Sequence, residues 1–171
     1  SVHGAYWVYY GVISSFSSVF LLARGFSNSQ IGIIIALANI LAVIIQPYLA
    51  DYVDRSRRTA IFSVMASMCI ALVLFTNIIL VAKNHVVLGT FYVAAFMLQS
   101  VMQPFCNGLN RVLEDGGNKI YFGFCRSIGS LVYSIVVVAL GYMVDSYTVD
   151  IIPKAGILTT LVLLIVVWFS Y

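Results

Sequence analysis

The sequence predicts an all-α membrane protein, and three observations lead to that fold class. Of the 171 residues, 62% are hydrophobic and only 9% are charged, whereas soluble domains carry about 25% charged residues. The apolar residues gather in long runs, and about 20 such residues are enough for one helix to cross a hydrocarbon core of about 30 Å. The runs are apolar on every side, whereas outer-membrane strands alternate polar and apolar residues over about 10 positions. We therefore expect membrane-spanning helices.

Six apolar runs, separated by short polar breaks, define the predicted spans. They cover residues 5–23, 31–50, 60–82, 86–106, 120–144 and 151–171. The first run follows no basic segment and continues directly into a membrane pattern, so we interpret it as a span and not as a signal peptide. Because all the connections are short, we expect residues 1–171 to form a single six-helix transmembrane bundle without a soluble domain.

The polar breaks contain residues that end one helix and begin the next. After the first span, Gly25 is placed to end a helix, and Ser27 or Asn28 is placed to cap the following one. The later breaks read DRSRRT, KNH, EDGGNK and DSYTVDIIPK, which are polar stretches of the kind that separate helices. Local chemistry and hydropathy therefore predict the same boundaries.

The distribution of Lys and Arg predicts the orientation of the bundle. The side reached after the second and fourth spans carries Arg55, Arg57, Arg58, Arg111, Lys119 and Arg126, and the other side carries Arg24, Lys83 and Lys154. Basic residues are in excess in cytoplasmic loops, so we expect a cytoplasmic N-terminus in a multi-pass protein of the cytoplasmic or inner membrane. No basic patch with interleaved aromatic residues indicates binding to nucleic acid.

Polar side chains within the spans are the candidates for function, because a polar group in hydrocarbon costs free energy unless it finds a partner or faces a water-filled cavity. One polar stripe consists of Gln99, Gln103 and Asn107 on the fourth span, and a second consists of Arg126, Ser130 and Tyr133 on the fifth. Intervals of three or four residues keep each stripe within about 80° of one helix face. Further polar residues are Ser14, Ser17 and Ser18 on the first span and Asn39 and Gln46 on the second.

Two other interpretations of these residues stay open. Ser, Asn and Gln join membrane helices by interhelical hydrogen bonds of about 1 kcal/mol with no ligand involved. Arg126 lies near the start of its span, where an arginine can extend its guanidinium group to the lipid headgroups.

The sequence does not contain the motifs of an intramembrane enzyme. Neither HExxH nor GxSxG occurs, and His3 and His85 lie near span ends, where we expect them at the membrane interface. Cys69, Cys106 and Cys125 are scattered without CxxC spacing, so we interpret them as small apolar residues. We therefore expect no catalysis, no metal and no cofactor.

Residues 25–58, GFSNSQIGIIIALANILAVIIQPYLADYVDRSRR, resemble the second span and following loop of the major facilitator superfamily. Asp54, Arg55 and Arg58 fall on the acidic and basic positions of the loop motif of that family, although Ala50 and Arg57 replace its two glycines. The resemblance implies that Asp54 accepts hydrogen bonds from a helix N-terminus of a second half, or pairs with Arg55 or Arg58. It also implies that the loop, assisted by Asp51, helps to hold the outward-open state.

The segments SQIGIII, QPYLAD and FGFCRSIGSLVY resemble the branch that contains lactose permease and related oligosaccharide and nucleoside proton symporters. In that branch, an arginine of the fifth span binds the sugar and an aromatic residue seven positions later stacks on it, and Arg126 and Tyr133 occupy those positions. The carboxylate that shares the sugar with the arginine falls on Asn107. An amide cannot pair ionically with Arg126, so galactoside specificity is not implied.

The resemblance implies that the six helices form the N-terminal half of a major facilitator fold. The expected function is that of a secondary active transporter, a proton-coupled symporter of a sugar, nucleoside or similar small polar solute that works by alternating access. The expected partners are the solute, protons, the lipid bilayer and a C-terminal six-helix half, in the same chain or separate. A non-transporting scaffold or subunit and a facilitator of an organic anion stay open as alternatives.

Overall fold

The computed structural model describes residues 2–55, 59–115 and 122–169, without the side chains of some residues near the ends of these segments, among them Arg126. In chain order, the helices are α1 (Val2–Ser15), α2 (Ser17–Ala23), α3 (Asn28–Arg55), α4 (Thr59–Val81), α5 (His85–Asp115), α6 (Phe122–Ser146) and α7 (Ile151–Phe169). With α1 and α2 forming one span, six helical segments are long and apolar enough to cross a membrane. The predicted all-α class with six spans is therefore confirmed.

Two of the helices extend well beyond the predicted apolar runs. Helix α3 continues to Arg55 and α5 to Asp115, although the corresponding runs end near residues 50 and 106. Hydropathy detects only the part of a helix that lies in hydrocarbon, whereas polar residues such as Asp51 and Arg55 are compatible with a helix that continues into water. The side chains of these two residues form an ion pair one turn apart, which supports the extra turn.

The first span is interrupted at a single residue. Phe16 has φ −104° and ψ 9°, which separates α1 from α2. Ser17 Oγ donates a hydrogen bond to the carbonyl of Ser14 at 2.8 Å, and the amide of Phe20 donates to the carbonyl of Phe16 at 3.0 Å. Because the hydrogen bonding resumes at once, the two helices continue as one span.

The connection between α2 and α3 has the residues that the sequence predicts for it. Gly25 has φ +87°, in the left-handed region that glycine adopts without strain. Ser27 and Gln30 form a reciprocal cap, in which each side-chain oxygen accepts a hydrogen bond from the backbone amide of the other residue, at 3.3 and 2.8 Å. Ser27 is therefore the N-cap of α3, and Asn28 is its first residue.

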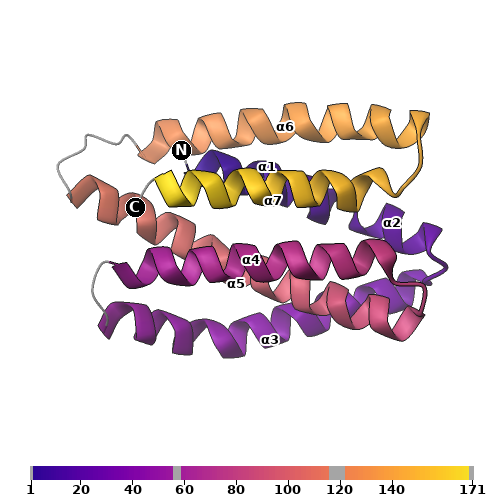
Figure 1. The fold of residues 1–171 in the computed structure, drawn as a ribbon, viewed down its shortest axis with the longest axis horizontal. Coiled ribbons are helices and arrows are strands. Elements are labelled where there is room, and N and C mark those ends of the chain that lie inside the picture. Colours follow the sequence, from indigo (N-terminus) through magenta and orange to yellow (C-terminus); the bar gives the residue numbers. More distant parts are fainter. Residues whose placement is uncertain (1, 56–58, 116–121, 170–171) are drawn as a thin grey trace.

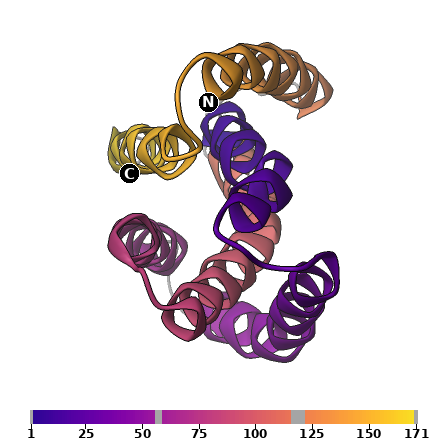
Figure 2. The ribbon, with the colours of Figure 1, turned by 90° about the vertical axis from the view of Figure 1, so that its right-hand side faces the viewer.

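Helices α1 and α5 occupy the middle of the bundle. Helix α1 packs against α6 and α7, and α5 packs against α3 and α4. Both chain termini lie at the left-hand end in Figure 1. Seen end-on in Figure 2, α4 and α7 lie on one side of the central pair, and α3 and α6 lie at opposite ends of the arrangement. One long side of both central helices is therefore bordered by α3 and α6.

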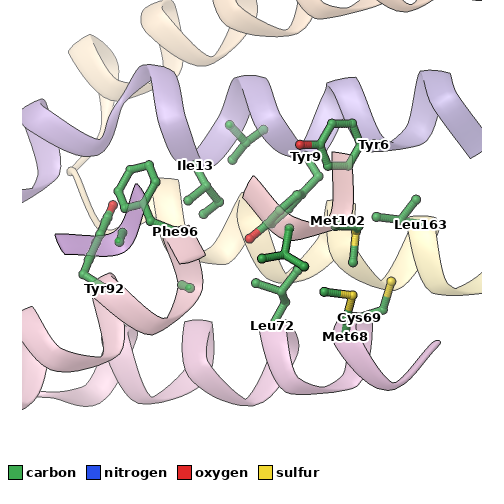
Figure 3. Close-up of a cluster of buried hydrophobic side chains, with 14 of the residues drawn as sticks. Tyr6, Tyr9, Ile13, Met68, Cys69, Leu72, Tyr92, Phe96, Met102 and Leu163 are labelled. Atoms are coloured by element: carbon green, nitrogen blue, oxygen red, sulfur yellow. The ribbon is translucent and has the colours of Figure 1, made fainter. Parts of the chain in front are cut away.

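The core lies between the central pair and the α4–α7 side. Figure 3 shows Tyr6, Tyr9 and Ile13 of α1 facing residues of α4, α5 and α7, among them Leu72 and Leu163, all of them buried. Gly156 of α7 permits close approach here, because a Cβ atom at this position would overlap the end of the Ile13 side chain and lie 3.4 Å from Thr76 Cγ2. The close packing of α1 on α7 thus depends on glycine at position 156, which has no side chain.

Three connections at one end of the bundle meet at Arg24, which follows α2. Its guanidinium group lies 2.7 Å from Asp150 Oδ1, just before α7, and 5.0 Å from the centre of the Phe20 ring. Its carbonyl accepts a hydrogen bond from Nε2 of His85, the first residue of α5, at 2.7 Å. The ends of α2, α5 and α7 are therefore joined directly through one residue.

Candidate functional site

An aromatic cluster of Trp7, Tyr10 and Tyr133 joins α1 to α6. The Trp7 ring centre lies 5.3 Å from that of Tyr10 and 6.0 Å from that of Tyr133, both edge to face. The rings of Tyr10 and Tyr133 lie 6.5 Å apart and are tilted by 41°. All three side chains are half-buried, so the cluster is supported by the bundle and still exposes part of its ring surface.

Tyr133 is held against α1 by a hydrogen bond and by a close backbone approach. Its hydroxyl lies 2.8 Å from Ser15 Oγ, and either oxygen can be the donor. Its ring lies over Gly11, where a Cβ atom would approach Tyr133 Cδ2 to 2.9 Å and Val137 Cγ2 to 3.2 Å. Any side chain larger than hydrogen at Gly11 would displace the ring, so two positions of α1 fix the orientation of Tyr133.

Gln99 of α5 points into the contact between α5 and α1. Only 1% of its surface is exposed. Ser14 Oγ donates a hydrogen bond to Gln99 Oε1 at 3.1 Å, and the Tyr6 hydroxyl donates to the backbone carbonyl of Gln99 at 3.0 Å. Nε2 of Gln99 is buried and has no hydrogen-bond partner among the described residues. Gln99 thus joins two helices and retains one unused donor.

The polar stripe of α5 divides between the interior and the surface. Gln99 is buried, Gln103 is exposed and Asn107 is half-buried. The three share one face of α5, but α1 covers that face at Gln99. Gln99 therefore joins two helices by a hydrogen bond, as the first alternative interpretation expects. Gln103 and Asn107 remain accessible and are candidates for binding a solute.

The stripe of α6 contains Ser130 and Tyr133, together with Arg126. Ser130 is exposed, and its backbone carbonyl accepts a hydrogen bond from Ser134 Oγ at 3.0 Å. Arg126 belongs to α6, but its side chain lies outside the described residues. The placement of its guanidinium group near Tyr133 therefore stays a prediction from their seven-residue spacing.

The structure adds residues that the sequence reasoning did not select for the site. Trp7, Tyr10 and Ser15 lie on α1, where the sequence analysis singled out other serines. Trp7, Tyr10 and Ser14 follow at three- and four-residue intervals, a helical spacing that could have identified this face. On the other side of α5, Ser100 Oγ donates a hydrogen bond to Asn39 Oδ1 of α3 at 3.3 Å. Polar contacts therefore link α5 to both α1 and α3.

Neutral groups make up the described part of this face. Its polar atoms are hydroxyl and carboxamide groups, and no cluster of three or more His, Cys, Asp or Glu residues that could hold a metal ion occurs within the described segments. The arrangement can offer stacking surface and hydrogen bonds to a solute. A formal charge at this face would come from Arg126.

The loop motif lies at the opposite end from Arg24. Arg55 Nε pairs with Asp51 Oδ1 at 2.8 Å, and both side chains are exposed. Asp54 is also exposed. Of the two partners expected for Asp54 within the loop, Arg55 is engaged with Asp51, and Arg58 lies outside the described residues.

Comparison with known proteins gives one match. The model of the MFS_1 like family matches residues 1–171, which is the whole chain. No curated protein and no solved structure gives a significant match.

Proposed function

The chain belongs to the MFS_1 like family of membrane transporters, and from that premise we propose that it is the N-terminal half of a secondary transporter that carries a small polar solute by alternating access. The lipid bilayer is its surroundings, because six helical segments are long and apolar enough to cross a membrane. In such transporters the solute binds near the bilayer midplane between two halves that move around it. The proposed second partner is accordingly a C-terminal six-helix half.

The observation that carries the proposal is the fixed orientation of Tyr133. A ligand site needs a side chain whose position is set before the ligand arrives, because ordering it on binding would cost affinity. Ser15, Gly11 and the rings of Trp7 and Tyr10 restrain Tyr133 from several directions. An aromatic ring held in this way can cover the apolar face of a sugar or a nucleobase.

Arg126 is the proposed anchor for the polar side of the solute. It precedes Tyr133 by seven residues on α6, so the two side chains leave the helix within about 20° of the same direction. A guanidinium group offers five hydrogen-bond donors in a rigid fork, which suits vicinal hydroxyl groups or a carboxylate. Gln103, Asn107 and Ser130 would supply neutral hydrogen bonds on the same face.

We propose a sugar, a nucleoside or a similar solute, moved together with protons. The class of solute and the proton coupling rest on the resemblance to the lactose permease branch, and the membrane-embedded carboxylates and histidines that carry protons in that branch belong to its second half. The neutral character of the described face favours a second candidate, a facilitator of an organic anion, because Arg126 would then pair with the anion itself.

A fluorescence titration of the full-length protein tests the proposal. The chain has two tryptophans, and Trp168 is 75% exposed on α7, so Trp168→Phe would leave Trp7 as the reporter within this half. Tryptophans of any further segment would be replaced in the same way. Sugars, nucleosides and organic anions would be titrated as a panel, and we expect one class to change the Trp7 emission. Uptake of the identified solute into vesicles, with and without a proton gradient, then tests coupling.

Arg126 variants decide whether the same face binds the solute. A hydrogen bond to a charged donor contributes about 1.5 to 3 kcal/mol, so Arg126→Ala should weaken binding by about 10- to 100-fold. Arg126→Lys should restore little, since a point charge lacks the two-pronged geometry. Wild-type affinity in Arg126→Lys would instead place the arginine at the membrane interface. If no member of the panel binds or is transported, the scaffold alternative becomes the better description.

A further inference from the structure

An asparagine is exposed on the outside of the bundle, within a membrane span of α4. Asn77 belongs to the segment Ile61–Val81, which is long and apolar enough to cross a membrane, and its side chain is exposed. Leu74, 57% exposed, and Val81, 76% exposed, lie beside it, and we call these three residues the outer face of α4. Polar residues in a span almost always face the inside of a bundle, because in hydrocarbon they cost free energy unless they find a partner. Asn77 departs from this rule.

The outer face of α4 points away from the core and from the proposed solute face. Leu72 of α4 is fully buried. Leu74, Asn77 and Val81 leave the helix at least about 140° away from it. In Figure 2, α4 lies with α7 on one side of the central pair of helices, whereas α3 and α6 border the side that we propose to bind the solute. A C-terminal half on that side would leave the outer face of α4 uncovered.

The carboxamide of Asn77 points into the membrane and not toward the nearer membrane surface. Asn77 lies four residues before Val81, the last residue of α4, which is about 6 Å of helix. Side chains of a helix tilt toward its N-terminus, here toward the membrane interior. Nδ2 accordingly donates a hydrogen bond to the carbonyl of Val73, one turn back, at 2.8 Å. This bond uses one of the two N–H groups and leaves Oδ1 without a partner among the described residues.

We infer that the outer face of α4 is the contact between two copies of this chain in the membrane. Acyl chains have neither donors nor acceptors, so the surrounding hydrocarbon cannot bond to the free groups of Asn77. All copies insert with the same orientation, so Asn77 of a second copy lies at the same depth. A two-fold axis normal to the membrane brings the two carboxamides together, and each can donate its free N–H to Oδ1 of the other. Asparagine side chains join membrane helices by hydrogen bonds of this kind.

Apolar side chains flank the carboxamide in this contact. Leu74 precedes Asn77 by three residues and Val81 follows it by four, which is the spacing by which two helices pack side by side. Crossing helices diverge away from their point of contact, so Ile70, one turn deeper than Leu74, stays toward lipid. Lys83 is exposed beyond the end of α4, where salt screens the repulsion between the two copies. The inference does not depend on the identity of the solute or on transport.

The experiment counts photobleaching steps of the labelled full-length protein in liposomes, over a range of protein-to-lipid ratios. We expect the wild type to form dimers and Asn77→Leu to weaken dimerisation at least about threefold, because an interhelical hydrogen bond is lost. Asn77→Gln keeps a carboxamide and should retain most of the affinity. Asn39→Leu is the matched control and should dimerise normally. Asn39 is an exposed carboxamide of α3, but its Oδ1 already accepts a hydrogen bond from Ser100 within the bundle.

Cysteine cross-linking locates the contact independently of Asn77. The background is Cys125→Ser, since Cys69 and Cys106 are buried. In this background, Leu74→Cys should give a cross-linked dimer on oxidation with copper phenanthroline. Leu158 is 64% exposed but belongs to α7, so Leu158→Cys is the control and should stay uncross-linked.

A wild type that stays monomeric at the highest protein-to-lipid ratio would overturn the inference, as would equal dimerisation of Asn77→Leu and the wild type. Cross-linking of Leu158→Cys without cross-linking of Leu74→Cys would also overturn it, because the contact would then lie on α7. If Leu74→Cys in native membranes were cross-linked only to a different protein, the assignment to a second copy would be wrong. If Asn77→Leu failed to fold, the cross-linking of Leu74→Cys would decide.

Discussion

The hydroxyl groups of Ser15 and Tyr133 lie 2.8 Å apart, although the two residues are separated by 118 positions in the chain. This contact joins α1 to α6 beside the aromatic cluster. It gives Tyr133 two separable properties, a ring that can stack and a hydroxyl that orients the ring.

Variants of Tyr133 should separate these two properties. Tyr133→Phe removes one hydrogen bond and keeps the ring, so solute affinity should fall by no more than about fivefold, the equivalent of about 1 kcal/mol. Tyr133→Ala removes the stacking surface and should cost more than about tenfold. The measurement is the Trp7 fluorescence titration. Tyr142 lies on the same helix and is 73% exposed, so Tyr142→Ala is the control and should bind normally. Equal losses in Tyr133→Phe and Tyr133→Ala would contradict this separation and would mean that the ring alone, without its hydroxyl, contributes nothing to solute binding.

Cysteine labelling should follow the division of the α5 stripe. A small hydrophilic thiol reagent should modify Gln103→Cys fastest, Asn107→Cys more slowly and Gln99→Cys least, and the solute should protect the first two. Cys125→Ser is a suitable background, because Cys69 and Cys106 are buried and should not react.

Ile70→Cys on α4 provides the control for this labelling. Ile70 is 52% exposed, and we expect it to face lipid, which a hydrophilic reagent does not enter. Labelling of Ile70→Cys as fast as Gln103→Cys would show that exposure in the bundle, and not a water-filled path, governs the reaction.

Two buried tyrosines of α1 should respond oppositely to loss of the hydroxyl. Tyr6 donates a hydrogen bond to the carbonyl of Gln99 at 3.0 Å, so Tyr6→Phe should lower the free energy of unfolding by about 1 kcal/mol. Tyr9 is fully buried, and its hydroxyl has no partner among the described residues. Tyr9→Phe should therefore leave stability unchanged or raise it by about 1 kcal/mol. Thermal unfolding in detergent measures both, and a loss in Tyr9→Phe equal to that in Tyr6→Phe would reveal a partner for the Tyr9 hydroxyl.

Gly156 should tolerate no side chain while Ile13 is present. Gly156→Ala would force the Ile13 side chain or α7 to move, and overpacking of this kind costs about 1 to 3 kcal/mol. Gly32→Ala is the control. It has open space around it and should gain up to about 1 kcal/mol from helix propensity. Combining Gly156→Ala with Ile13→Ala should recover part of the loss, and no recovery would place the clash with another neighbour, such as Thr76.

Asp54 and Asp51 should differ in their effect on transport. Asp51 is paired with Arg55, whereas Asp54 is exposed and has no ion-pair partner among the described residues. If Asp54 contacts the second half in the outward-open state, Asp54→Asn should reduce uptake and increase labelling of cysteines from the cytoplasmic side. Asp51→Asn should have a smaller effect, because an exposed ion pair contributes little. Unchanged uptake in Asp54→Asn would leave the loop as a determinant of insertion only.

The sequence was sufficient to predict those features that depend only on residues nearby in the chain. The turn at Gly25, the cap at Ser27 and the six spans follow from local composition. The fate of Gln99 and Gln103 could not be predicted in this way, because the two share a helix face and only the crossing of α1 buries one of them. The break at Phe16 has no glycine or proline to announce it. Likewise, the orientation of the Tyr133 ring depends on Gly11. The need for glycine at this position could not be predicted from the sequence, because it follows from the packing of α1 against α6.

The contact between Arg24 and Asp150 has a consequence for how the protein is made. The two residues are 126 positions apart, so Arg24 leaves the ribosome long before its partner is synthesised. Throughout that interval the first span is inserted with an unneutralised arginine at its end, and the ion pair can form only once the sixth span begins. Completing this end of the bundle is therefore a late step of biogenesis, and nascent chains that stop before Asp150 should join α2 to α5 through the hydrogen bond between Arg24 and His85 but should lack the ion pair that ties in α7.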